Sequence, residues 1–148
     1  IVIATAVSGL LGGFSVEIAV VKLPTRRRIG PVAYATFARG SDLGNGRWFY
    51  PFMAISAALA TLLASVVAYV ERQPTTLLVP LSLATLLSIG HFIVTARAAP
   101  IMLRVSKTSN DVTLLAPLLD RFVRWHAVRA TLQVLTFFVL LWALLFVR

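Results

Sequence analysis

Cysteine is absent from this chain of 148 residues, and charged side chains are scarce, at 13% of the total. Without cysteine, neither a disulfide-stapled secreted fold nor a thiolate zinc site is possible. Soluble domains carry about 25% charged residues, so 13% charged and 59% hydrophobic residues argue against an ordinary soluble domain. The high hydrophobicity also excludes an intrinsically disordered chain. The lipid bilayer is therefore the expected solvent and first partner.

Acidic residues are the scarcer charged class, with five Asp and Glu against 14 Lys and Arg and a net charge of +9. A basic excess raises the question of nucleic-acid binding, which requires a basic face on a soluble module. Here the basic residues lie at the ends of apolar runs, as they do beside membrane-spanning helices. We therefore expect no nucleic-acid partner.

Long apolar runs dominate the sequence. Three of them contain no Asp, Glu, Lys or Arg over 23, 24 and 18 positions, namely Trp48–Val70, Gln73–Ala96 and Ala130–Val147. A fourth, at the start of the chain, is interrupted only by Glu17. About 20 apolar residues cross the hydrocarbon core as a helix. The prediction is an all-α integral membrane four-helix bundle, a single transmembrane domain over 1–148 with spans at about 1–22, 50–71, 76–97 and 123–147.

The segments between the apolar runs contain residues that predict helix ends, a short helix and turns. Lys22-Leu23-Pro24 is predicted to end the first helix at an interface. Pro31 to Arg39, stopped by Gly40, is typical of a short interfacial helix, and Gly44-Asn45-Gly46 of a turn back into the membrane. Glu71 to Pro74 is short enough to make a tight antiparallel hairpin. The last helix is expected to begin near Asp111, a good capping residue.

The distribution of basic residues predicts an orientation. Twelve of them lie in or beside the first and third loops, and only Arg72 and Arg148 lie on the other side. Cytoplasmic loops carry the excess of Lys and Arg. We expect a protein of the bacterial cytoplasmic membrane with both large basic loops in the cytoplasm.

Four ionisable residues fall inside the predicted spans: Glu17, His91, His126 and Arg129. A charge near the bilayer centre costs about 2.5–3.5 kcal/mol on insertion scales, so such groups normally face the bundle interior. Each lies within six residues of a basic residue at the span boundary, and at about 1.5 Å per residue all four lie within roughly 10 Å of one boundary. A shared polar pocket is therefore predicted near the basic loops.

Helical spacing places further small or polar residues on the same faces as these groups. The matching sets are Gly9, Gly13 and Glu17; Ser88, His91 and Thr95; and His126, Arg129 and Gln133. In the second span Ala57, Thr61 and Ser65 form a packing face. His91, Thr95 and Gln133 are the expected substrate-binding residues.

Three interpretations of the pocket remain open. In a structural one, Glu17 pairs with Arg129 and the histidines hydrogen-bond across helices. In a catalytic one, His126 removes a proton from a substrate, Arg129 stabilises the anion and Glu17 orients the imidazole. In the third, Glu17, His91 and His126 form a two-histidine, one-carboxylate site for iron or copper. Outside that third interpretation, no cofactor is expected.

The stretch Arg124-Trp125-His126-Ala127-Val128-Arg129, followed by an apolar helix ending Leu141-Trp142-Ala143-Leu144-Leu145, resembles the C-terminal signature of the anthrone-oxygenase-like family. These are small four-helix integral membrane proteins, many of them domains of unknown function. The order of the preceding segments is also similar. The resemblance implies oxidation of a polycyclic aromatic substrate by molecular oxygen in a few members, and it carries His126 and Arg129 over as site residues.

The expected function is thus an oxygenase-like enzyme acting on an aromatic or lipophilic small molecule. The alternative is a non-catalytic accessory or structural subunit of a larger membrane complex. That alternative requires partner membrane subunits or a homo-oligomer to cover one face of the bundle.

Overall fold

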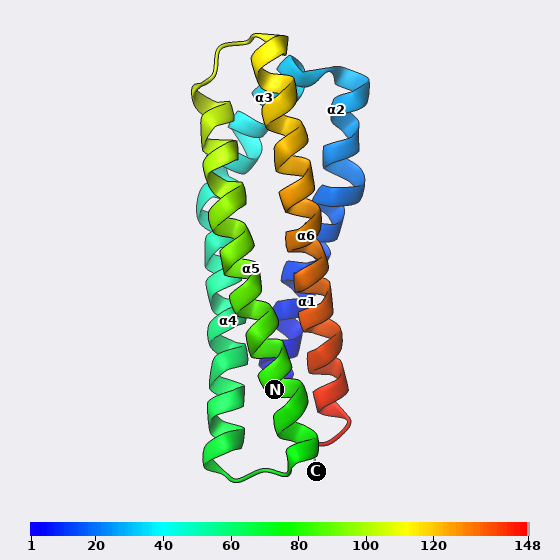
Figure 1. Ribbon diagram of the computed structural model, residues 1–148, viewed down its shortest axis with the longest axis vertical. Helices are drawn as coiled ribbons and strands as arrows, with labels where there is room; N and C mark the ends of the chain where they lie inside the picture. The colour runs from blue at the N-terminus through cyan, green and yellow to red at the C-terminus, as the bar shows by residue number, and fades with distance from the viewer. Residues whose placement is uncertain (148) are drawn as a thin grey trace.

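The computed structural model describes residues 1–147, and these residues contain helices and no strands (Figure 1). Arg148, counted above among the basic residues, lies outside the described residues. The elements in chain order are α1 (Val2–Glu17), the π-helical η1 (Ile18–Lys22), α2 (Leu23–Ile29), α3 (Pro31–Gly40), the π-helical η2 (Ser41–Asn45), α4 (Gly46–Val70), α5 (Thr75–Lys107) and α6 (Val112–Leu144).

Four long helices run side by side along the molecule (Figure 1). Helix α1 packs against α4 and α6, and α5 packs against the same two, so the four form a closed ring. We call the end that carries residues 23–45 and 108–111 the basic end, and the end with the turn at 71–74 the hairpin end. Ile1 and Val147 both lie near the turn at the hairpin end. The predicted all-α four-helix bundle is confirmed.

The helices are long and apolar enough to cross a membrane, in the segments Val2–Ile29, Pro31–Val70, Thr75–Lys107 and Val112–Leu144. Large apolar side chains face outward on each of them, as lipid-facing surfaces do. Length and composition thus support a membrane protein. The helices exceed the predicted spans at the basic end, since α5 runs to Lys107 and α6 begins at Val112.

The predicted end of the first helix at Lys22-Leu23-Pro24 is wrong. The chain passes through the π-helical turn η1 and stays helical to Ile29. Proline is tolerated in the first turn of a helix because its missing N–H would have no partner there, and Pro24 occupies such a position in α2. The helix ends instead at Gly30, whose φ of 83° favours glycine.

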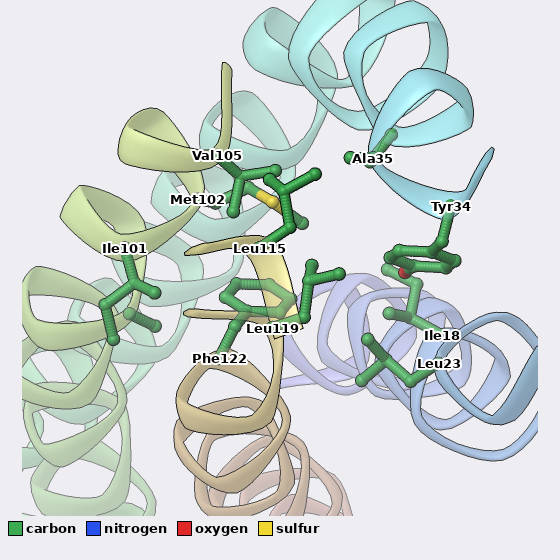
Figure 2. Packing of buried hydrophobic residues seen from close by; sticks show 12 residues of the cluster. Ile18, Leu23, Tyr34, Ala35, Ile101, Met102, Val105, Leu115, Leu119 and Phe122 are labelled. Carbon is green, nitrogen blue, oxygen red and sulfur yellow. The ribbon is translucent and has the colours of Figure 1, made fainter. Parts of the chain in front are cut away.

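Helix α3 is the predicted short helix over Pro31 to Arg39, and it packs on α6 and α5 at the basic end. Its buried Tyr34 belongs to a hydrophobic cluster to which α5 contributes Met102 and α6 contributes Leu115 and Leu119, and its ring lies beside Ile18 and Leu23 (Figure 2). Arg39 donates from Nη2 to the carbonyl oxygens of Val105 at 3.2 Å and Thr108 at 2.7 Å. The last carbonyls of α5 therefore gain the partners that a helix end lacks.

At the other end, the turn between Glu71 and Pro74 makes the predicted antiparallel hairpin of α4 and α5. Ser65 and Thr85 join the two helices by a hydroxyl hydrogen bond of 2.8 Å. Thr61 and Ala57 are buried about one and two turns away from Ser65, which confirms the predicted packing face of α4. A hydrogen bond thus joins the hairpin helices near their turn.

The N-cap of α6 gives a pH-dependent prediction. Hydrogen bonds to Asp111 from the Thr113 hydroxyl and backbone N–H, at 2.7 and 2.8 Å, hold the pKa of its carboxyl below the ordinary value. A depressed pKa means that the cap stabilises the fold above the unfolded value and loses its effect as pH falls through the folded value. We expect Asp111→Ala to lower the thermal unfolding midpoint in detergent at pH 7, and this loss should shrink as pH falls below about 4, the ordinary pKa of an aspartate. Asp111→Asn, which keeps a good N-cap, is the control; an equal loss in both variants would contradict the capping role.

Candidate functional site

Glycines on α1 let α6 approach closely. A Cβ atom built on Gly9 would lie 2.8 Å from the Phe137 ring, and one on Gly12 would lie 3.7 Å from the Gln133 carbonyl oxygen. Nothing lies within 4 Å of such an atom on Gly13, which is exposed. The face of α1 toward the bundle thus passes through Gly12 and Ser15, whereas the sequence analysis placed it through Gly13 and Glu17.

A chain of buried hydrogen bonds joins three helices at this approach. The hydroxyl of Ser15 on α1 donates to Oε1 of Gln133 on α6. Nε2 of Gln133 donates to Nε2 of His91 on α5 at 2.7 Å. Because His91 accepts at Nε2, its neutral ring carries the proton on Nδ1. The chain fixes His91 and Gln133 relative to α1.

His126 lies beside this chain and is fully buried, with 0% of its surface exposed. Its Nε2 donates to the backbone carbonyl of Ser15 at 3.1 Å, and its Nδ1 accepts from Nη2 of Arg129 at 2.7 Å. The ring packs against Phe122, with centroids 5.7 Å apart. Both ring nitrogens are therefore engaged, and the neutral Nε2–H tautomer is the one that satisfies both contacts.

Arg129 has no acidic partner within 4.0 Å in the part of the chain that the structure describes. Its Nη2 donates a hydrogen bond to Nδ1 of His126, and its Nε is buried without a hydrogen-bond partner. A guanidinium offers five donors and stays charged at any physiological pH. The bundle interior thus holds a cation that no carboxylate of residues 1–147 neutralises by direct contact.

The expected pairing of Glu17 with Arg129 is wrong. The Glu17 carboxylate lies 3.6 Å from Nζ of Lys22, and 46% of its side chain is exposed. At about 100° per residue, Glu17 points roughly 200° away from Ser15, the α1 residue that faces the site. Among residues 1–147 no three His, Asp or Glu side chains come together as a metal site. The predicted set of Glu17, His91 and His126 is therefore not brought together.

A cavity of about 320 Å³ lies next to the hydrogen-bonded chain. Much of its polar wall is formed by a group of side chains from α1, α5 and α6: Ser15, His91, Thr95, Arg129 and Gln133. Most of the remaining wall is apolar and comes from all four long helices: Leu11, Phe14, Ala54, Ile55, Phe92, Ala99, Met102, Leu103 and Phe122. The cavity therefore combines a largely apolar interior with two cationic side chains, the part-buried Arg129 and the exposed Arg47.

The cavity reaches the surface between α4 and α5, in the halves of these helices nearer the basic end. Three of its lining residues there, Ile55, Ala99 and Leu103, are also exposed on the outer surface. Toward the basic end the rim carries Asp42, Arg47 and Tyr50. Lys22 lies 3.9 Å from the Asp42 carboxylate and donates to the Tyr50 hydroxyl at 3.4 Å. The opening thus lies beside the lipid-facing surface of the hairpin, with a polar edge.

Four of the six predicted site residues line the cavity: His91, Thr95, Gln133 and Arg129. His126 does not line the cavity but contacts three residues that do, namely Ser15, Phe122 and Arg129, and Glu17 lies outside. Sequence reasoning missed Ser15, because it weighed only ionisable groups as anchors. The spacing of Ser8, Gly12 and Ser15, which follows one face of a helix, was the available signal.

Searches against protein-family models, curated proteins and solved structures gave no match. The resemblance to the anthrone-oxygenase-like family therefore stays a prediction. The assignment of function rests on the geometry of the cavity and its lining.

Proposed function

We propose that the cavity binds a lipophilic, flat aromatic small molecule that carries an acidic hydroxyl or carboxyl group. The observation that supports this most is Arg129, a cation without a carboxylate partner that lines a cavity with largely apolar walls. An uncompensated charge inside an apolar bundle is costly, and an anionic oxygen of a ligand would offset that cost. Charge-assisted hydrogen bonds from a guanidinium are also stronger than neutral ones.

The size and position of the cavity support a ligand dissolved in the membrane. A volume of about 320 Å³ is at the lower end of the range for small-molecule sites, roughly 300–1,000 Å³. The opening between α4 and α5 is bordered by lipid-exposed side chains, so a hydrophobic molecule can arrive from the bilayer. We further propose that the basic end faces the cytoplasm of a bacterial cell, since twelve basic residues lie there or close by.

The proposed reaction is the oxygenation implied by the family resemblance. One molecule of dioxygen oxidises a ring CH₂ of a hydroxyanthrone to C=O, and the two hydrogens leave with the second oxygen atom as water. Loss of a proton from the substrate would generate an anion that Arg129 stabilises. For a histidine to accept that proton, one hydrogen bond must open, either Gln133 to His91 or Arg129 to His126. Of the two rings, that of His91 lines the cavity.

Binding can be tested with the purified protein in nanodiscs, with hydroxyanthraquinone as the acidic probe and unsubstituted anthraquinone as the matched neutral one. We expect the hydroxylated probe to bind once per chain and more tightly. Ala99→Trp places a bulky ring at the cavity opening and should weaken binding about five- to 150-fold, the range set by an overpacking cost of about 1–3 kcal/mol. Ala96→Trp is the control, because Ala96 is an exposed alanine of the same helix that does not line the cavity.

Absence of binding by either probe, or equal binding in the two tryptophan variants, would contradict a ligand site at this cavity. Either result would favour the alternative of an accessory subunit, in which the cavity is a gap between packed helices that binds no ligand. Turnover of a hydroxyanthrone in oxygenated membranes then separates an enzyme from a binding protein.

A further inference from the structure

A second, much smaller cavity lies on the inner side of His91, toward the hairpin end. The space open to the centre of a water molecule is about 10 Å³, which is room for about one water. Its lining includes Ser8 of α1, Ser88 and His91 of α5, and Gln133 and Thr136 of α6. Three of the four long helices therefore contribute a polar side chain to a space that holds one small molecule.

Several of these polar groups have no protein partner. Ser8 is 3% exposed, and its Oγ is buried with no hydrogen bond. Ser88 Oγ and Nδ1 of His91 also make no hydrogen bond with residues 1–147, and Thr136 donates to the carbonyl of Leu132. Of these atoms only Ser8 Oγ is both fully buried and without a partner. A buried hydroxyl without a partner costs free energy, and such groups in proteins are normally satisfied by an ordered water.

We infer that one ordered water occupies this cavity and bridges Ser8, Ser88 and Nδ1 of His91. The tautomer of His91 supports the direction of the bonds. Because Nε2 accepts from Gln133, Nδ1 carries the hydrogen and donates a hydrogen bond to the water oxygen. The Ser8 hydroxyl, which has no other acceptor, donates to the same oxygen, and the water donates to Ser88 Oγ. Three partners match the usual number for a buried water. The water extends the chain of Ser15, Gln133 and His91 back to α1 and holds His91 in one tautomer.

Whether one substitution raises or lowers the stability of the protein tests for this water, and the test needs no ligand in the larger cavity. In a dry cavity Ser8→Ala removes an unsatisfied hydroxyl and raises stability. With a bridging water it removes a hydrogen bond, and the folding equilibrium constant should fall about three- to fivefold. The measurement is reversible unfolding in mixed micelles. Ser82→Ala, at an exposed serine of α5, is the matched control and should change little.

A double-mutant cycle gives a second test, since Ser8 and Ser88 share the water. The combined Ser8→Ala and Ser88→Ala variant should lose less than the sum of the two single losses, whereas Ser8→Ala combined with Ser82→Ala should be additive. A gain in stability from Ser8→Ala, or additive losses in the first cycle, would overturn the inference. If Ser8→Ala does not fold, an experimental map of the wild-type protein decides, by density for a water beside Ser8 Oγ or by an empty cavity.

Discussion

Replacing Arg129 by alanine is expected to weaken binding of hydroxyanthraquinone by at least about 30-fold, because truncating one partner of a buried charged pair costs 2–5 kcal/mol or more. Two cationic side chains line the cavity, and Arg129 is the less exposed of them, since Arg47 is exposed on the surface. Neutral anthraquinone, which offers no anionic oxygen, should lose far less. The measurement is a titration of each probe into wild-type and variant protein in nanodiscs, followed by fluorescence.

Two further variants separate charge from geometry. Arg129→Lys keeps the charge but not the planar fork of donors, so we expect intermediate binding of the acidic probe. Arg124→Ala removes an exposed cation of the same helix that does not line the cavity, and it should leave binding unchanged. A loss of affinity in Arg124→Ala equal to that in Arg129→Ala would indicate general attraction by the basic end. Unchanged binding in Arg129→Ala would remove the proposed site.

The fold can be predicted from the sequence because the apolar runs are long enough to define the membrane-spanning helices. A stretch of 23 or 24 residues without Asp, Glu, Lys or Arg fixes a helix and its approximate span, and short connections fix which helices are neighbours. The helix ends at the basic end were less predictable. Pro24 was interpreted as a stop, but a proline in the first turn of a following helix is compatible with a continuous path. The ends of α5 and α6 beyond the apolar runs are set by packing with α3, which the runs do not encode.

The sequence predicts how deep each site residue lies along its helix, but it does not predict which way the side chains of the first helix point. Counting residues from a basic boundary gives the height of a side chain along a helix, and His91, His126 and Arg129 do meet at one height. The direction depends on which face of α1 meets α6, and Gly9 is compatible with either of two faces. Gly12 and Ser15, rather than Gly13 and Glu17, lie on the face that packs. Two residues along a helix change the direction by about 200°, which is enough to move a carboxylate from the interior to the surface.

His126 gives the second large effect. His126→Ala should lower the free energy of unfolding by about 2–4 kcal/mol, through the cavity left by a fully buried ring and the loss of two hydrogen bonds. The Ser15 carbonyl would lose its donor, and Arg129 would lose the acceptor that fixes its guanidinium. Reversible unfolding in mixed micelles measures this loss. An unchanged free energy of unfolding would show that the two contacts contribute nothing.

His126→Gln distinguishes a positioning role from a proton-accepting one. A glutamine amide can donate from Nε2 to the Ser15 carbonyl and accept at Oε1 from Arg129, which reproduces both contacts of the imidazole, but it does not take up a proton near neutral pH. If His126 only positions Arg129, His126→Gln should bind hydroxyanthraquinone within about threefold of wild type, a difference of less than 1 kcal/mol, and should keep any hydroxyanthrone turnover. Retained binding with abolished turnover would instead make His126 the base, and would require the hydrogen bond from Arg129 to open during the reaction.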